Sequence, residues 1–379
     1  MTGIGIIGCG FVADYYAHTL AKYSGLEVVA VADRDIDRAR RFASHHGYEV
    51  AASPSALLAD DGVEIVLNLT NPRSHVEVTR AALEAGKHVY SEKPLAMDFS
   101  DAVKLVELAE AQGLQLSAAP CSLLGESAQT IWKAIREDRI GTVRLVYAEM
   151  DDGLIHQMAY RHWRSTAGAP WPARDEFEVG TVIEHAGYIT SWLPAMFGPV
   201  VSIKGFADCR IPEKDGVKVD GTDLSIGILN FASGVIARVS CTLIAPHDHT
   251  LRVIGDHGVL STDDTWFYDS KVTIRRSINI RQRHQWLPKR RVSMVGSTQR
   301  YRYRGGHQMD FARGVADLAE AVTEGRSPRL SARYCLHVNE ITLALSSALR
   351  DGADYRMTTT FDPVDPMPWA LTSNGHASA

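Results

Sequence analysis

Short apolar segments alternate with amphipathic segments along the first 120 residues of the chain. The apolar segments have the length of buried strands, and the amphipathic ones repeat apolar residues every three to four positions, as helices do. This alternation predicts a parallel sheet with helices on both faces. The expected strands are residues 3–7, 27–32, 64–69, 88–90 and 115–119, and the expected helices are residues 11–22, 36–45, 75–85 and 100–111.

After Pro120 the strict alternation stops. Two apolar runs, 224–231 and 235–243, are joined by a short turn that contains Gly234, which predicts an antiparallel hairpin. Further expected elements are a helix at 128–136, a strand at 143–150 and helices at 310–324 and 335–350. The pattern predicts an α/β protein with a doubly wound Rossmann domain over residues 1–120, an α+β domain over 121–355 and an extended or disordered tail over 356–379.

The composition is that of an ordinary globular protein, with 379 residues, 45% hydrophobic and 22% charged residues, and it excludes wholesale disorder. No apolar run reaches the roughly 18 to 20 residues that span a membrane, and a strand-like run at residues 4–7 leaves no room for a signal peptide. The five cysteines are scattered and form no C-x-x-C pair, which fits reduced thiols. We therefore expect a soluble, cytoplasmic protein. The net charge of −5 gives no reason to expect nucleic acid or a membrane as a partner.

A glycine-rich motif follows the first expected strand and opens the first expected helix: Gly8, Cys9, Gly10, Phe11, Val12 and Ala13. In this context Gly8 makes a tight turn, Gly10 admits a pyrophosphate to the backbone, and the small Ala13 lets helix and strand pack. Asp33 ends the second strand, where a carboxylate binds the ribose hydroxyls of NAD and repels the 2′-phosphate of NADP. Arg34 beside it would favour that phosphate. The sequence therefore predicts NAD as cofactor and leaves NADP possible.

The segment Glu92-Lys93-Pro94 lies just past the carboxyl end of the strand at 88–90, at the edge where doubly wound sheets bind ligands. Together with the glycine motif, this segment resembles the glucose-fructose oxidoreductase/inositol dehydrogenase (Gfo/Idh/MocA) family, and the resemblance covers nearly the whole chain. It implies that Lys93 binds the reacting hydroxyl beside the nicotinamide and assists proton transfer. It also implies a second domain with an open, mainly antiparallel sheet that makes the contact of a homodimer or homotetramer.

The family's second motif, Asp-x-x-x-His, aligns with His185 in the histidine position and with Thr181 in place of the acid. A hydroxyl cannot take the charge of the missing carboxylate. Glu184 is adjacent to His185 but points about 100° away from it on a helix, so we do not expect it to substitute. His185 is the candidate general acid/base, because an imidazole can take the proton of an alcohol as hydride leaves. A buried structural histidine is the alternative.

The end of the strand at 64–69 is expected to line the nicotinamide pocket, although a helix-capping turn explains the same residues. The expected cofactor-binding residues are Gly8, Gly10, Phe11, Val12, Ala13, Asp33, Arg34, Thr70, Asn71, Pro72, His75, Glu92 and Lys93. The expected substrate-binding residues are Lys93, Asp152, His156, Arg161, Trp163, Thr181, His185 and His307. The expected catalytic residues are Lys93 and His185.

A polyol is the expected substrate, because the expected substrate residues mix aromatic rings with hydroxyl-binding polar groups. Alternating arginines at residues 300–304 could hold an anionic group of the substrate, although a solvated face or a neighbouring subunit explains them as well. His247 and His249 resemble metal ligands, but the sequence shows no third clustered ligand, and we expect no metal.

The expected function is that of an NAD(P)-dependent oxidoreductase, which transfers hydride between nicotinamide and a secondary alcohol or ketone of a sugar, amino sugar, cyclitol or derivative. Two alternatives stay open. One is an enzyme that retains NAD and uses transient oxidation for elimination, epimerisation or glycoside cleavage. The other is a dinucleotide-sensing regulatory protein, against which the presence of Lys93 and His185 argues.

Overall fold

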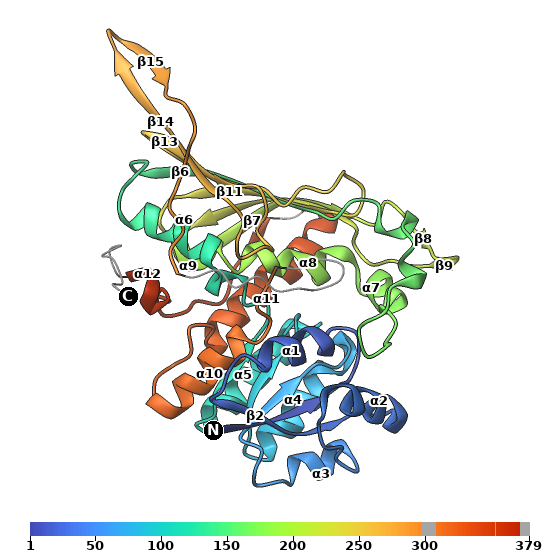
Figure 1. The fold of residues 1–379 in the computed structure, drawn as a ribbon. Coiled ribbons are helices and arrows are strands. Elements are labelled where there is room, and N and C mark those ends of the chain that lie inside the picture. Colours follow the sequence, from blue (N-terminus) through green and yellow to red (C-terminus); the bar gives the residue numbers. More distant parts are fainter. Residues whose placement is uncertain (297–307, 353, 372–379) are drawn as a thin grey trace.

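The structure is a computed structural model, and it describes residues 1–296, 308–352 and 354–371. Within these ranges, no helix has both the length and the apolar character needed to cross a lipid bilayer. Figure 1 shows two stacked parts, a smaller sheet with its helices and a larger sheet beyond it.

The first part is a five-stranded parallel sheet in the order β2-β1-β3-β4-β5, flanked by helices. It confirms the predicted doubly wound fold. The strands are nearly continuous apolar runs because both faces of the sheet are covered. The elements are β1 (Thr2–Ile7), α1 (Ala13–Leu20), β2 (Leu26–Ala32), α2 (Ile36–His46), α3 (Pro54–Leu58), β3 (Ile65–Asn68), α4 (His75–Glu84), β4 (His88–Ser91), α5 (Phe99–Ala111) and β5 (Leu116–Ala118).

Helix α3 was not expected from the apolar pattern, because five residues are too few to show a helical period. Its start does carry a local signal. The side chain of Ser53 accepts a hydrogen bond from the backbone N–H of Ala56, and Pro54 occupies the first helical position.

The second part is a ten-stranded sheet that is antiparallel except for the parallel pair β6 and β11. The predicted hairpin is confirmed as β10 paired with β11. The strands are β6 (Val143–Asp151), β7 (Val200–Asp208), β10 (Leu224–Phe231), β11 (Ile236–Thr242), β12 (Leu251–Gly255), β13 (Gly258–Thr262), β14 (Val272–Ile280), β15 (Arg283–Trp286), β16 (Arg290–Arg291) and β17 (Tyr355–Arg356), with a separate hairpin of β8 (Glu213–Lys214) and β9 (Val217–Lys218). The helices are α6 (Glu126–Arg136), α7 (Ala173–Val179), α8 (Thr181–Thr190), α9 (Leu193–Phe197), α10 (Arg313–Glu324), α11 (Ala332–Ser346) and α12 (Pro368–Leu371).

Helices cover one face of the large sheet, and they separate it from the Rossmann domain (Figure 1). Helix α11 packs against α8, β7 and β10 of the second part and against α5 and β5 of the first, so it joins the two. Helix α10 lies late in the sequence but packs on β4 and β5. A Cβ at Gly314 would lie 2.3 Å from the hydroxyl oxygen of Tyr90. The close approach of α10 to β4 therefore needs glycine at this position.

The tail expected to be extended or disordered contains one helical turn, α12, and residues 357–367 between β17 and α12 form neither helix nor strand. This stretch is held in place. The carboxylate of Glu340 accepts hydrogen bonds from the backbone and hydroxyl groups of Thr358 and Thr359, and Phe361 packs on the core. Residues 372–379 lie outside the described part.

Candidate active site

The glycine loop between β1 and α1 has the shape that a dinucleotide needs. Gly8 has a φ of +102°, and a Cβ there would lie 2.5 Å from the carbonyl carbon of Leu69, so a side chain is excluded. At Gly10 a Cβ would meet nothing within 4 Å, which leaves the backbone open to a ligand. Ala13 is fully buried beneath the loop.

Asp33, at the end of β2, holds the loop from below. Its carboxylate accepts hydrogen bonds from the backbone N–H of Cys9 at 2.9 Å and of Asp35 at 2.9 Å. The Arg38 guanidinium lies 3.7 Å from the same carboxylate. Arg34 and Arg38 both line the cavity beside Asp33. The structure therefore places two arginines at the expected ribose site, whereas the sequence analysis considered only Arg34.

Two adjoining cavities, of about 360 and 380 Å³, extend from this loop to the junction of the two domains. They share Gly10, Arg34, Arg38, Leu69, Thr70 and Asn71. The second cavity is also lined by Phe11, Val12, Pro72, His75, Glu92, Lys93, Trp171, Asp175, Glu176, Glu184, His185, Tyr188 and Trp266, among others. An extended space with an open glycine backbone and two arginines at one end fits NAD or NADP.

Two of the expected cofactor residues, His75 and Glu92, make hydrogen-bond contacts within the protein. Both ring nitrogens of the buried His75 lie beside backbone carbonyl oxygens, Pro94 at 2.7 Å and Thr70 at 2.9 Å. The carboxylate of Glu92 accepts from the Tyr16 hydroxyl at 2.7 Å. These side chains support the cavity wall. The alternative of a helix-capping turn is met in part: Pro72–Ser74 form a 3-10 turn before α4, but the Asn71 side chain donates to Asp175 and makes no cap bond.

Lys93 stands in the second cavity just past the end of β4, and its ammonium group forms an ion pair with the carboxylate of Glu184 on α8. Both side chains are largely buried. Burial opposes the ammonium charge, but the Glu184 carboxylate outweighs it and raises the pKa of Lys93 well above its ordinary value. Lys93 is therefore held as a cation at neutral pH.

Glu184 makes no contact with His185, in keeping with the angle between the two side chains, but it has a partner of its own in Lys93. Glu184 and His185 are neighbours on α8, and both line the cavity. Side chains about 100° apart on a helix can line the same cavity wall, and Tyr188, one turn further along α8, lines it as well. Glu184 faces the Rossmann domain, while His185 faces the end of β6.

His185 contacts Asp152 through Nδ1, and its Nε2 lies 3.8 Å from the carboxylate of Glu176 on α7. Burial disfavours the imidazolium, but Asp152 and Glu176 outweigh it and raise the pKa of His185. Asp152 also accepts from Nε2 of the buried His249 at 3.1 Å. Asp152, which the sequence analysis expected to bind substrate, therefore orients His185.

Several expected substrate residues do not reach the cavity. Thr181 is buried at the start of α8, and Arg161 is exposed and pairs with Asp215. His156 and Trp163 do not line the cavity either. Trp163 packs edge-to-face against Trp171, which does line it. His156, Arg161 and Trp163 lie in the irregular segment before α7, where a sequence pattern cannot show which side chains turn inward. His307 and residues 300–304 lie outside the described part.

The sequence analysis missed Trp171, Glu176, Tyr188 and Trp266 as cavity residues. Burial and the charge of Glu184 raise the pKa of Glu176 to about 7. The clustered tryptophans and prolines before α7 were a compositional signal, but the register of the segment comes from tertiary contacts.

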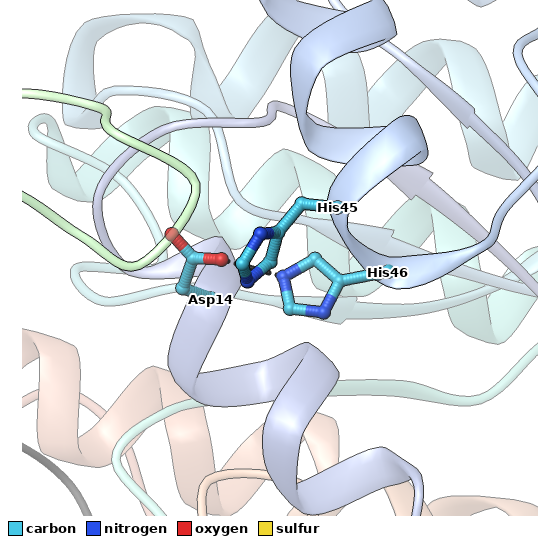
Figure 2. Close-up of side chains that lie close together, drawn as sticks. All are labelled: Asp14, His45 and His46. Atoms are coloured by element: carbon cyan, nitrogen blue, oxygen red, sulfur yellow. Dashed lines mark hydrogen bonds and ion pairs between the residues drawn. The ribbon is translucent and has the colours of Figure 1, made fainter.

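One such contact is made by Asp14 on α1, shown in Figure 2 with His45 and His46 of α2. The Asp14 carboxylate pairs with His46 at 2.5 Å and accepts from the backbone N–H of Ala167 at 3.0 Å. It therefore fastens the loop that carries Trp171 to the helix that follows the glycine motif.

Comparison with known proteins identifies the family of this chain. A family model described as "Oxidoreductase family, NAD-binding Rossmann fold" matches residues 2–119, and the "GFO/IDH/MocA C-terminal domain" matches residues 128–261. The chain is an oxidoreductase with an NAD-binding Rossmann domain. It belongs to the GFO/IDH/MocA family, as the resemblance implied.

Two relatives differ in identity and in the share of the chain that they match. Trans-1,2-dihydrobenzene-1,2-diol dehydrogenase of Mus musculus is 26% identical over 69% of this chain and 74% of its own length. Inositol 2-dehydrogenase 3 of Saccharopolyspora erythraea is 36% identical over 30% of this chain and 34% of its own length.

Solved structures share the whole fold. An oxidoreductase from Agrobacterium radiobacter, crystallised with NAD⁺, L-tartaric acid and magnesium, has a TM-score of 0.76 at 16% identity and covers 94% of this chain and 98% of its own. A 3-ketoreductase from Actinomadura kijaniata, crystallised with NADP and TDP-benzene, has a TM-score of 0.70 at 24% identity and covers 93% of this chain and 97% of its own.

The Asp33 carboxylate gives a first test of cofactor choice. We expect Asp33→Ala to weaken NADH binding roughly tenfold or more, because hydrogen bonds to a charged group contribute about 1.5–3 kcal/mol. NADPH binding should weaken less, because the same change removes a negative charge facing the 2′-phosphate while Arg34 and Arg38 remain. Fluorescence titration of both nucleotides measures the ratio, with Asp37→Ala on the exposed side of α2 as control. Equal losses for both nucleotides would show that Asp33 only supports the loop.

Proposed function

We propose that this protein is an NAD(P)-dependent dehydrogenase or reductase that acts on a secondary alcohol or ketone of a sugar, amino sugar, cyclitol or related polyol. The observation that carries the proposal is the convergence of Lys93 and His185, from two different domains, on one cavity that also holds the cofactor residues. The relatives named for diols and inositol support the substrate class.

The division of roles follows from the protonation states. Bound nicotinamide supplies the hydride acceptor or donor. Lys93 is held as a cation by Glu184 and is suited to stabilise the developing charge on the reacting oxygen. His185 is held by Asp152 through Nδ1, which leaves Nε2 to exchange the hydroxyl proton. Glu176 lies beside that nitrogen and provides an outlet for the proton.

The character of the cavity near His185 favours an uncharged polyol. Asp175, Glu176 and Glu184 line it together with the aromatic rings of Trp171 and Tyr188. Carboxylates bind hydroxyl groups and repel phosphates, while the rings offer apolar faces to C–H groups. These carboxylates disfavour the alternative of an anionic substrate.

Substitution of the two central residues tests the proposal. We expect Lys93→Ala and His185→Ala each to lower kcat/KM about 10²–10⁴-fold, the range of a lost acid/base or electrostatic contribution. Lys104→Ala, which removes an exposed lysine of α5, is the control and should match the wild type. The assay follows NADH formation across a panel of polyols, sugar phosphates and nucleotide sugars. Wild-type turnover in both variants would refute the assignment, and turnover without net NADH would indicate transient oxidation.

The pH dependence has a predicted sign. Alcohol oxidation needs neutral His185, so its rate should rise as pH increases through the raised pKa, and ketone reduction should fall over the same interval. Asp152, Glu176 and Lys93 are the charged groups that face His185. In Asp152→Asn the pKa of His185 falls, and the rising limb for oxidation should move to lower pH. Asp256→Asn, at an exposed ion pair, is the control.

Glu176 also titrates near neutral pH and therefore needs a separate variant. Glu176→Gln should keep a rising limb, moved to lower pH because one negative charge beside His185 is lost. Disappearance of the limb in this variant would assign it to Glu176 instead of His185.

We also propose that the chain forms a homo-oligomer through the open face of the large sheet. The proposal is supported by Val201, Phe206, Ile226 and Ile236, which point away from the helices and are 41–48% exposed. Phe206 and Ile226 are direct cross-strand partners and form an adjoining apolar pair on this face. Contact of this face with the same face of a second copy would remove these apolar side chains from water.

Light scattering on the purified chain tests this interface. Ile226→Asp should shift the mass toward the monomer, because a buried carboxylate without a partner costs several kcal/mol. Ile36→Asp, at an exposed position on α2, should leave the mass unchanged. An unaltered mass in Ile226→Asp would exclude this face as the contact.

A cytoplasmic location is part of the proposal as well. It is supported by the five cysteines, all of which are free thiols and four of which are buried.

A further inference from the structure

A second cluster of titratable side chains lies behind the active site, outside the cavity. It consists of His247 and His249, before β12, and Asp264, after β13. One ligand atom from each residue lies within 4.8 Å of the other two. The sequence analysis rejected a metal here for want of a third ligand, and the fold supplies that ligand in Asp264.

The backbone fixes two of these residues side by side. His249 and Asp264 pair in a parallel β-bridge, and the N–H of Thr265 donates to the carbonyl of His249 at 3.1 Å. Asp264 Oδ1 accepts from the backbone N–H of Trp266 at 2.7 Å. The rings of His247 and His249 lie with centroids 4.1 Å apart. The cluster is therefore placed by main-chain pairing as well as by side-chain rotamers.

His249 carries a polar atom that needs a partner. Its side chain is 1% exposed, and Nε2 lies 3.1 Å from Asp152 Oδ1. Nδ1 is buried and has no hydrogen-bond partner among the described residues. An unsatisfied buried nitrogen costs about 1–3 kcal/mol, so a ligand that binds it removes a penalty that the apo protein bears.

The arrangement of His249 is that of a metal-ligating histidine. Such a residue donates one ring N–H to a carboxylate and binds the ion through the other nitrogen. Here Asp152 is the carboxylate, and Nδ1 is directed away from it on the same ring.

We propose that His247, His249 and Asp264 bind a divalent transition-metal ion of the Zn²⁺ type, with water completing the coordination. Two imidazoles and one carboxylate suit zinc, whereas magnesium and calcium prefer sites built from oxygen ligands. Zinc bonds of about 2.0–2.2 Å place tetrahedral ligand atoms roughly 3.4 Å apart, so the cluster must contract. The exposed side chain of His247 is free to make that movement.

The proposed metal site is linked to the catalytic His185 through the carboxylate of Asp152. Asp152 holds His185 with one oxygen and His249 with the other. An ion on Nδ1 of His249 fixes the proton on Nε2 and so orients Asp152 toward His185. The ion is a positioning element in this scheme and takes no part in hydride transfer, and its binding is measurable independently of the proposed function.

The chain offers a matched control in Asp14, His45 and His46, which have the same composition of side chains (Figure 2). In that cluster the carboxylate is already engaged by His46 and by the backbone N–H of Ala167. We assign it to the fastening of the loop and expect no metal there.

Calorimetric titration of the untagged, chelator-treated full chain with Zn²⁺ tests the proposal, and Co²⁺ absorption reports the ligand set. We expect one equivalent bound at micromolar or tighter affinity. His247→Ala and Asp264→Asn should each weaken binding at least tenfold, whereas His45→Ala should bind as the wild type. His247 is exposed, so its removal leaves the core intact.

Three results would overturn the proposal. They are the absence of saturable binding by the wild type, unchanged affinity in His247→Ala, and loss of binding in His45→Ala, which would place the ion at the cluster of Figure 2.

Discussion

The ion pair between Lys93 and Glu184 joins the two domains at the place where the substrate must react. Lys93 comes from the carboxyl edge of the parallel sheet, and Glu184 comes from the helix that carries His185. Both groups are largely buried, so loss of one partner would leave the other as an uncompensated charge, at a cost of about 3–5 kcal/mol. The pair therefore constrains the distance between the sheet edge and α8, and the cavity between the domains depends on that distance.

A second constraint sets the direction of the imidazole. Asp152, at the end of β6, accepts from two histidines that come from different parts of the large sheet and its helices. With Nδ1 of His185 held there, Nε2 is the nitrogen available to the cavity. The parallel pairing of β6 with β11 places the end of β6 beneath α8. The chemistry of His185 thus rests on a carboxylate more than thirty residues away in the sequence.

Much of the Rossmann domain could be predicted because its signals are local. Each parallel strand is an apolar run of a few residues, and the glycine motif lies directly between the first such run and a helical pattern. Asp33 and Lys93 follow strands directly, so their place at the sheet edge follows from their place in the sequence. Helix α3 escaped prediction because it is too short to show a period.

In the second domain, a local signal identified the hairpin β10 and β11 and the family resemblance identified His185, but neither identified the partners of His185. Glu184 was set aside because neighbouring helix residues point about 100° apart, but that angle does not show which other residue, here Lys93, the side chain contacts. Glu176 and Trp171 lie in or next to an irregular segment, where no periodicity indicates the buried face.

The amino-acid sequence by itself determined the alternation of strands and helices in the Rossmann domain and the glycine motif, because these patterns rest on neighbours a few positions apart, whereas Lys93 and His185 were found through the family resemblance. Only the tertiary structure decided which acid holds which base, and it brought Asp264 to His247 and His249. Those contacts join segments far apart in the chain, and their geometry comes from strand register and from the packing of α8 and α11 between the two sheets.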